Sequence, residues 1–535
     1  MKNKSKQEEL LKGSAWMTAG SIGSRLLGAV YTIPWVTWMG IHSNEANSLF
    51  AQGYNIYNLF LIVATAGIPA AVSRLVAQYN GENNYSISRH LYRSGLYVAL
   101  LMGIMSSFVM VSGASLMDNG DKDVIPVINS LAFTVLIMPT ISVTRGYFQG
   151  YGLMAPSAIS QFTEQFFRVA YMLGITFFIM EVIHGNWKNA VTQSTFAAFI
   201  GALSGLVVLI IALIKYRKIL SINNAKSDKL GSTRKLMLKV VCQSIPFIII
   251  ESGITIYQLI DQYTFFSIME LFRNISRYKL NFYYALFSFN ANKLYMIIIS
   301  IAMSIAATVI PILAMLKSKN DKRGIKTQIK NTQLLFLLIM VPTALGLYSV
   351  AQQIYTVFYK YDSLGIMVLE FSAFIALPLG MYTVNAAIMQ GLSESKVMLK
   401  YLFIGILLKL IFQLPSIYFF QVFGPLLATG FSMIVVNLLI LRYFYFNYDF
   451  KVLDILKNIN QIVIFSLVMC FITRFFITFI NKPFDAYNRY VAFVCLTLAA
   501  FIGGAIYLFL VLKFRVADKI IGYKAERLRT KLNIK

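Results

Sequence analysis

The sequence predicts an all-α membrane protein with about fourteen transmembrane helices, in two pseudo-repeated six-helix lobes plus two C-terminal helices. Its 535 residues are 58% hydrophobic and only 13% charged, which is too apolar for one water-soluble core. Apolar runs of about 20 residues, enough for a helix to cross roughly 30 Å of hydrocarbon, recur along the chain. A β-barrel is disfavoured because whole segments, such as residues 203–213, are apolar on both faces.

The first six spans form an N-terminal lobe, predicted over residues 1–220. A polar, basic segment precedes the first span, and short connections separate the apolar runs that follow. In chain order, we expect these spans at residues 14–38, 50–77, 91–115, 124–148, 156–181 and 190–214.

A basic connection leads to a C-terminal six-helix lobe, predicted over residues 238–447. Its spans are expected at residues 238–269, 284–315, 328–351, 364–390, 397–420 and 422–445. Two extra transmembrane helices, at 458–480 and 488–512, make up a further segment over residues 455–515, and residues 516–535 form a basic cytoplasmic tail.

Most of the 48 lysines and arginines lie at the termini and in the even-numbered connections. Positive loops stay in the cytoplasm, so both termini are expected there, in a multi-pass protein of the bacterial cell membrane. The formal net charge of +26 therefore reflects topology, and we expect no nucleic-acid partner. The richest loops, residues 215–239 and 317–330, are interpreted as fixing orientation, with headgroup binding as the alternative.

An internal repeat relates the two lobes. Residues 50–77 align with residues 287–314 without a gap, and Gln149-Gly150 matches Gln390-Gly391 near the ends of the fourth and tenth spans. Identical residues coincide at Phe50 and Phe287, Asn55 and Asn292, Ile62 and Ile299, Ala70 and Ala307, Val72 and Val309, and Ala77 and Ala314. Transporters built from two such halves hold their substrate between them.

Basic residues inside predicted spans are candidates for binding an anion, since a charge at bilayer depth needs water or a partner. They are Arg25, Arg74, Arg145, Arg168, Lys293, Lys409 and Arg474. We predict that Arg25 and Lys293 face a wet cavity and that Arg74 and Arg145 guide an anionic ligand inward. The alternatives are a structural ion pair for Arg25 and a side chain reaching the headgroups for Lys293. Arg168 is interpreted as an i,i+4 pair with Glu164, and Arg474 is given no role.

Intramembrane acids are candidates for coupling transport to an ion gradient. Glu251 and Asp261 share the seventh span and are the two favoured residues. Lys409 offers an equal alternative, because its ammonium would neutralise one of these carboxylates as a built-in cation and make the pair structural.

The sequence carries no phosphate-binding loop, metal-ligand cluster or nucleophile motif, and no extramembrane loop is long enough for a catalytic domain. The three cysteines, Cys242, Cys470 and Cys495, lack metal-ligand spacing. We therefore expect no enzyme activity, no catalytic residue, no metal and no cofactor.

Three segments resemble a known family: SRLLG at residues 24–28, ANSLFAQGYNIY at 46–57 and AGIP at 66–69. They look like the YtgP and SpoVB branch of the polysaccharide transporters, in the MOP (MATE-like) superfamily that includes the MurJ-type lipid II flippases. The fourteen spans and two lobes fit the same family. The resemblance implies outward movement of an undecaprenyl-pyrophosphate-linked peptidoglycan precursor through a cationic cavity.

The resemblance places Arg25 on a family cavity arginine and Lys293 on a basic cavity position at the start of the eighth span. Two departures stand out. Tyr31 lies where the family has a further arginine, and Lys409 falls near where some members place a sodium-binding acid. Sodium coupling is therefore in doubt for this chain.

Three other functions compete with this reading. A flippase for another lipid-linked saccharide, such as a capsule, teichoic-acid or exopolysaccharide unit, would have the same architecture. A MATE-type multidrug exporter would bind cations and should place acids in its cavity, and a non-transporting scaffold would tolerate loss of Arg25. Expected partners are the lipid-linked saccharide, membrane lipids and, as driving force, a monovalent cation or the membrane potential. We expect a monomer.

Overall fold

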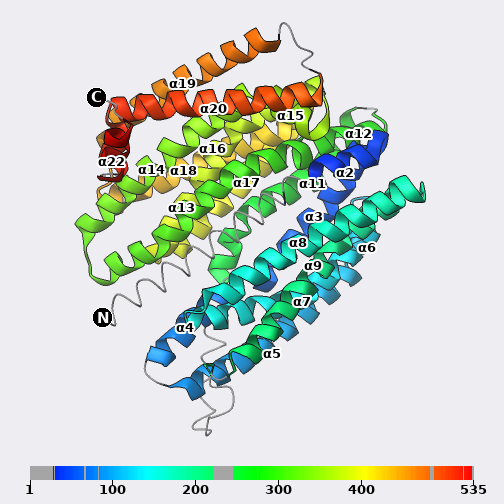
Figure 1. The fold of residues 1–535 in the computed structure, drawn as a ribbon, viewed down its shortest axis with the longest axis horizontal. Coiled ribbons are helices and arrows are strands. Elements are labelled where there is room, and N and C mark those ends of the chain that lie inside the picture. Colours follow the sequence, from blue (N-terminus) through cyan, green and yellow to red (C-terminus); the bar gives the residue numbers. More distant parts are fainter. Residues whose placement is uncertain are drawn as a thin grey trace. The chain divides into compact units, whose positions relative to one another are not determined.

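The computed structural model describes residues 28, 31–65, 68–81, 84–217, 219–220, 245–273, 275–481, 487–521 and 523–532 (Figure 1). Regular structure within these ranges is helical, without any β-strand. Ten helical stretches there are long and apolar enough to cross a membrane, which confirms an all-α polytopic membrane protein. The number fourteen stays a prediction.

The chain divides into two compact units, Met1–Leu259 and Ile260–Lys535. The predicted lobe boundaries at residues 220 and 238 stay a prediction. In the first unit, the described helices are α2 (Thr32–Met39), η1 (Gly40–His42), α3 (Ser43–Thr65), α4 (Ile68–Gly81), α5 (Tyr85–Ser112), α6 (Ala114–Met117), α7 (Val124–Gly150), α8 (Met154–Phe177), η2 (Phe178–Val182) and α9 (Trp187–Lys215).

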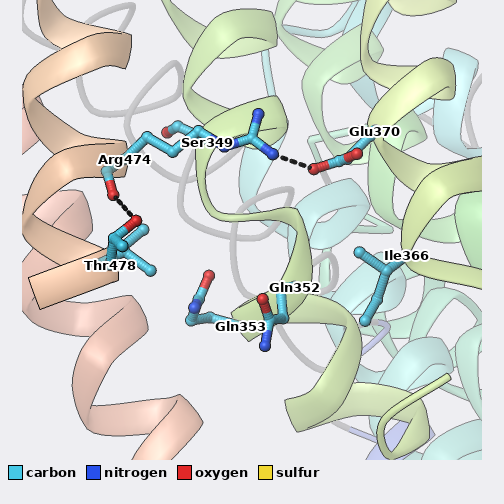
Figure 2. Close-up of a pocket in the computed structure, with 8 residues that line it drawn as sticks. Ser349, Gln352, Gln353, Ile366, Glu370, Arg474 and Thr478 are labelled. Atoms are coloured by element: carbon cyan, nitrogen blue, oxygen red, sulfur yellow. Dashed lines mark hydrogen bonds and ion pairs between the residues drawn. The ribbon is translucent and has the colours of Figure 1, made fainter. Parts of the chain in front are cut away.

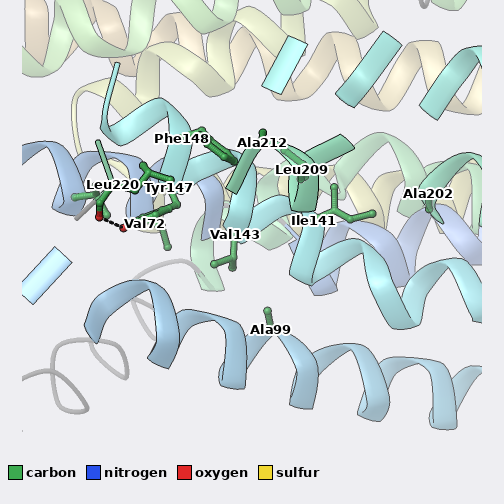
Figure 3. Close-up of a cluster of buried hydrophobic side chains, with 11 residues drawn as sticks. Val72, Ala99, Ile141, Val143, Tyr147, Phe148, Ala202, Leu209, Ala212 and Leu220 are labelled. Atoms are coloured by element: carbon green, nitrogen blue, oxygen red, sulfur yellow. Dashed lines mark hydrogen bonds between the residues drawn. The ribbon is translucent and has the colours of Figure 1, made fainter. Parts of the chain in front are cut away.

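Helix α7 is the centre of the first unit, because it packs against α3, α4, α5 and α9. Its apolar side chains meet those of α4, α5 and α9 in one buried cluster (Figure 3). Tyr147 lies fully buried there and donates a hydrogen bond of 3.3 Å from its hydroxyl to the backbone oxygen of Leu220. Because the Tyr147 hydroxyl has this hydrogen-bond partner, its burial avoids the desolvation cost of an unpaired hydroxyl.

The second unit begins inside α11 (Gly253–Phe272). The helices that follow are α12 (Arg277–Ala285), η3 (Leu286–Ala291), α13 (Asn292–Ser318), α14 (Lys322–Ser349), α15 (Ala351–Tyr359), α16 (Ser363–Gly391), α17 (Ser395–Phe420), η4 (Gln421–Phe423), α18 (Gly424–Tyr448), α19 (Leu453–Asn481), α20 (Arg489–Lys513), α21 (Val516–Ile521) and α22 (Tyr523–Lys531). Helix α16 packs against α13, α14 and α18, and α19 packs against α14 and α20.

Both units contain the same pattern of helix pairs. In the first, α7 packs on α3, α4, α5 and α9, and α8 packs on α9; in the second, α16 packs on α13, α14 and α18, and α17 packs on α18. These pairs correspond under the repeat found in the sequence. This correspondence supports a shared plan for the two lobes.

Equivalent glycines make equivalent close contacts. A Cβ atom added to Gly150 would lie 2.7 Å from Val76 Cβ and 2.9 Å from the Ser73 backbone oxygen. One added to Gly391 would lie 3.0 Å from Leu313 Cβ and 3.0 Å from the Ile310 backbone oxygen. The alignment of residues 50–77 with 287–314 pairs Ser73 with Ile310 and Val76 with Leu313. Glycine thus allows the same close helix approach in each unit.

Two expectations for the spans need correction. The span predicted at residues 50–77 consists of two helices, since α3 ends at Thr65 and α4 begins at Ile68. Pro69 occupies the second position of α4, where a missing backbone N–H costs no helical hydrogen bond. Helix α15 was also not predicted, because nine residues are too few for a membrane span.

Large apolar side chains cover the outer faces of several helices. Phe108 on α5, Phe471 on α19 and Phe501 on α20 are 70%, 74% and 77% exposed. Such surfaces favour acyl chains over water.

Candidate functional site

Helix α17 places two polar side chains in an otherwise apolar buried stripe. Its buried residues recur every three or four positions, as expected for one helix face: Met398, Leu402, Gly405, Lys409, Gln413 and Ile417. Lys409 is fully buried, with an exposed fraction of 0%. A lysine at such a position requires oxygen ligands around its ammonium.

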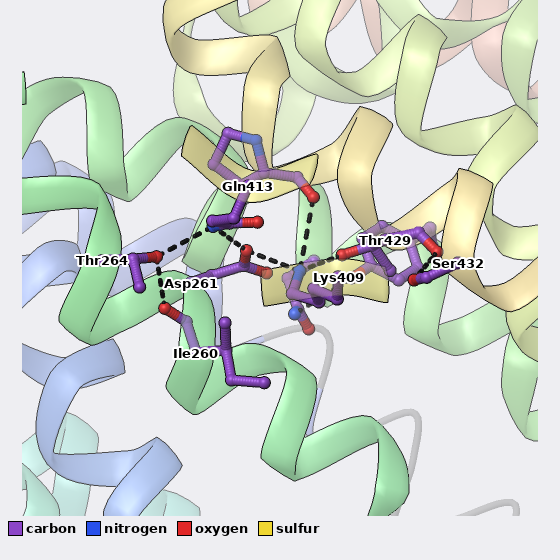
Figure 4. Close-up of polar contacts among 10 residues, drawn as sticks. Ile260, Asp261, Thr264, Lys409, Gln413, Thr429 and Ser432 are labelled. Carbon is purple, nitrogen blue, oxygen red and sulfur yellow. Dashed lines mark hydrogen bonds and ion pairs between the residues drawn. The ribbon is translucent and has the colours of Figure 1, made fainter. Parts of the chain in front are cut away.

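Those ligands come from two other helices (Figure 4). The Nζ atom of Lys409 donates to Asp261 Oδ1 on α11 at 2.7 Å and to the hydroxyl of Thr429 on α18. The backbone oxygen of Pro425 is 3.5 Å away. The ammonium therefore binds a carboxylate, a hydroxyl and a carbonyl oxygen.

Gln413 completes this network. Its Nε2 donates to Asp261 Oδ1 at 2.8 Å and to Thr264 Oγ1 at 3.0 Å. It lies one helical turn after Lys409, so both donors reach the same carboxylate oxygen. We call Asp261, Thr264, Lys409, Gln413 and Thr429 the ammonium site.

The ammonium site has no net charge when both ionisable groups are charged, because one carboxylate faces one ammonium. Oxygen atoms of this kind are also the ligands that bare alkali and alkaline-earth cations take in proteins. A free cation that bound Asp261 Oδ1 would compete with the Lys409 ammonium for that oxygen. The structure thus brings together two of the three residues predicted for coupling, while Glu251, the third, has an exposed side chain.

A second charged network crosses the first unit. Arg145 on α7 is 9% exposed, and its Nη2 donates to Glu164 Oε2 on α8 at 2.7 Å and to Ser160 Oγ at 2.8 Å. Ser160 in turn donates to the backbone oxygen of Gly205 on α9 at 3.0 Å. The charge of Arg145 is therefore balanced by Glu164.

This pairing shows that the predicted pair between Arg168 and Glu164 is wrong. Arg168 Nη2 instead donates to the Tyr54 hydroxyl on α3 at 2.6 Å, and the guanidinium carbon lies 5.2 Å from the Tyr54 ring centroid. The spacing of four residues suggested a local pair, but Arg145 reaches Glu164 from a different helix.

The remaining predicted cations are not brought together by the described residues. Lys293 lies in the first turn of α13, half-buried, with its Nζ 4.6 Å from the Phe289 ring centroid. Arg25 and the side chain of Arg74 lie outside the described residues. Their exposure to a cavity stays a prediction.

Sequence reasoning missed Thr429, Gln413 and Tyr54. Hydroxyl and amide side chains are common in transmembrane helices, so one of them alone carries little signal. The spacing of Lys409 and Gln413 on an apolar helix was the available clue.

Two family models match the chain. The one described as polysaccharide biosynthesis protein covers residues 10–317, and the MatE model covers residues 290–414. The first spans more than half of the chain.

Individual relatives agree with these matches. The chain is 31% identical to the lipid II flippase MurJ of Bacillus subtilis (strain 168) over 541 aligned positions, which cover 96% of this chain and 97% of that protein. It is 22% identical to the stage V sporulation protein B of the same organism over 45% of this chain and 46% of that protein.

Solved structures share the fold. A lipid II flippase MurJ in an inward closed conformation superposes with a TM-score of 0.65 and 15% identity, covering 94% of this chain and 99% of that chain. An inward-facing multidrug resistance MATE family transporter of the MOP superfamily gives a TM-score of 0.60 and 13% identity, covering 79% and 98%. The chain therefore belongs to the polysaccharide biosynthesis protein family and to its lineage that includes the lipid II flippase MurJ.

Proposed function

We propose that this protein is a flippase, which carries an undecaprenyl-pyrophosphate-linked peptidoglycan precursor of the lipid II class from the inner to the outer leaflet by alternating access. The observation that carries the proposal is the 31% identity to the lipid II flippase MurJ over 96% of the chain. The fold adds support, because the two units repeat one packing pattern, as expected for a transporter with two related halves. The MurJ proteins named above are flippases and the MATE protein is a transporter, and we propose no catalytic activity for this chain.

The substrate headgroup would bind to basic side chains. A pyrophosphate is held best by several charge-assisted hydrogen bonds, and arginine offers a planar fork for phosphate oxygens. We assign this role to Arg25, Arg74, Arg145 and Lys293. Arg145 would exchange its bond to Glu164 for a phosphate oxygen, so Glu164 acts as a resting counter-charge in the empty protein.

Alternating access requires an element that differs between the two access states. The boundary between the compact units falls inside α11, two residues before Asp261. Helix α11 therefore links the two units, and the bond between Asp261 and Lys409 connects α11 to α17. Lys409 also bonds to Thr429 on α18. The ammonium site is therefore our candidate for the element that differs between the two access states. Lys409 takes the place of a bound cation in it.

The membrane potential is the driving force that this site favours. A pyrophosphate diester carries about two negative charges, and moving one charge through 100 mV changes the free energy by about 2.3 kcal/mol. When the inside is negative by that amount, outward movement of two uncompensated negative charges is favoured by about 5 kcal/mol. Coupling to a cation at Asp261 is then unnecessary. We also propose that the protein is monomeric and that both termini lie in the cytoplasm.

Complementation tests the proposed function. In cells whose own lipid II flippase is depleted, the wild-type gene should restore growth. Arg25→Ala and Lys293→Ala should fail at normal membrane levels, while Arg442→Ala, at an exposed position on α18, should succeed. Failure of the wild-type gene, together with rescue of cells that lack a flippase for another lipid-linked saccharide, would assign the protein to that substrate.

A further inference from the structure

A polar pocket lies within the second unit, away from the ammonium site. It has a volume of about 390 Å³ and lies between α19 and the junction of α14, α15 and α16 (Figure 2). Its lining residues are Ser349, Gln352, Gln353, Ile366, Glu370, Arg474, Ile477 and Thr478. Six of the eight are polar or charged, which is unusual between apolar transmembrane helices.

The pocket lies where transmembrane helices end. Ser349 is the last residue of α14, and Ile366 lies in the first turn of α16, which begins at Ser363. Arg474 is seven residues before the end of α19 at Asn481, a rise of about 10 Å along the helix. The pocket is thus at the depth where lipid headgroups meet the hydrocarbon region.

An ion pair forms one wall. Arg474 Nη2 donates to Glu370 Oε1 at 2.9 Å, and the side chains are 46% and 24% exposed. The guanidinium carbon also lies 4.6 Å from the Tyr348 ring centroid. Glu370 uses one donor of a guanidinium that has five, so Arg474 keeps donors for a ligand.

Besides the spare donors of Arg474, the side chain of Gln353 also points to a ligand. Its side chain is 3% exposed, and its Oε1 has no hydrogen-bond partner among the described residues. Figure 2 shows the amides of Gln352 and Gln353 extending from α15 into the space near the Arg474–Glu370 pair. Rotation about the last side-chain torsion exchanges the oxygen and nitrogen of an amide, so Gln353 can present either atom. A buried amide oxygen without a donor is costly, and a ligand hydroxyl would satisfy it.

We propose that this pocket binds the phosphoglycerol headgroup of an anionic membrane lipid. The phosphate accepts hydrogen bonds from Arg474, and the glycerol hydroxyls donate to Glu370 and to the Gln353 amide oxygen. A bare anion fits less well, because Glu370 cancels the charge of Arg474. The volume is near the lower end of the roughly 300–1,000 Å³ range of ligand pockets, which suits a headgroup better than a saccharide with an attached peptide.

Thermal unfolding of the purified full-length protein in detergent tests this site. The probes are dihexanoyl phosphatidylglycerol, dihexanoyl phosphatidylcholine and free sn-glycerol 3-phosphate, and the readout is the unfolding midpoint against probe concentration. For the wild type, we expect the midpoint to rise with phosphatidylglycerol and to change little with the other two. Gln353→Leu and Arg474→Lys should each need at least tenfold more phosphatidylglycerol for the same rise.

Arg442→Lys is the matched control, since Arg442 is an exposed arginine on α18 that does not line the pocket, and its response should equal that of the wild type. Thr478→Val, which removes one hydroxyl from the wall, should also weaken binding and replaces any pocket variant that does not fold. An equal response of wild type and pocket variants would overturn the proposal. An equal rise of the unfolding midpoint with phosphatidylcholine would also overturn it. So would a rise with free glycerol phosphate, because the pocket would then be a site for a soluble ligand. Because no transport is measured, these outcomes are independent of the proposed flippase activity.

Discussion

The Lys409 ammonium lies 2.7 Å from the Asp261 carboxylate, although the Lys409 side chain is completely buried and 148 positions separate the two residues in the chain. Removing one partner leaves the other charge without compensation in a medium of low polarity. The effective cost of breaking such a buried pair is roughly 3–5 kcal/mol.

Single substitutions in this pair should therefore destabilise the protein more than the double substitution. We expect Lys409→Met and Asp261→Leu each to lower the thermal unfolding midpoint in detergent by several degrees. The double variant should recover most of that loss, because no unpaired charge remains. Additive losses in the double variant would show that the two charges do not interact.

Removing only the ammonium should create a cation-dependent protein. In Lys409→Gln, the Asp261 carboxylate and the oxygens of Thr429 and Pro425 remain, so Na⁺ or Li⁺ can take the position of Nζ. We expect millimolar Na⁺ to raise the unfolding midpoint of this variant and to leave the wild type and Lys293→Gln unchanged. A similar Na⁺ response in the wild type would mean that Lys409 does not fill the site.

The repeated glycines make a paired prediction. Gly150→Ala and Gly391→Ala should both lower the unfolding midpoint, because an added Cβ would lie within 3.0 Å of its neighbours. Gly504→Ala on α20 is the control, since nothing lies within 4 Å of its added Cβ. There the change should stabilise the helix by about 0.5–1 kcal/mol. If both repeat variants behaved like the control, the two glycine contacts would not be structural equivalents.

A surface pair predicts a pH effect with a defined sign. Lys326 Nζ lies 2.6 Å from Asp449 Oδ2, and this bond holds the pKa of Asp449 below its usual range. A lowered pKa means that the pair stabilises the protein above the ordinary carboxyl pKa of about 3.9, and that this contribution is lost as the pH falls through the folded value.

Wild type and Asp449→Asn should therefore differ in unfolding midpoint by a constant amount from pH 7 to 5. The difference should be lost only below the ordinary carboxyl pKa of about 3.9, as the pH falls through the lowered pKa of Asp449. Lys326→Met should have no further effect in the Asp449→Asn background. A difference that grew on acidification would have the opposite sign and exclude this ion pair.

The helices could be predicted because membrane insertion depends on the length and polarity of local segments. The second-lobe spans at residues 364–390 and 397–420 fall within α16 and α17, and the span at 422–445 matches α18 except for its first two residues, which belong to η4. Helix α15 and the start of a separate helix α4 at Ile68 could not be predicted in this way. Their positions depend on packing and on the local backbone, not on the number of apolar residues.

The site was less accessible to sequence reasoning. Pairing of Lys409 with a carboxylate of the seventh span was one of two readings, and the structure selects Asp261 as its partner. Arg145 and Glu164 could not be paired in advance, because sequence spacing favoured Arg168 as the partner. Such pairs depend on which helix faces which, and polarity along the chain does not encode that.

Exposure of lipid II on the outer leaflet tests the central claim most directly. In cells depleted of their own flippase and expressing this protein, an added enzyme that cannot cross the membrane degrades only the lipid II that has reached the outside. We predict that the degraded fraction returns to the level of undepleted cells with the wild type and stays near the depleted level with Arg25→Ala. A fraction that stays low with the wild-type protein present at normal membrane levels would contradict the account.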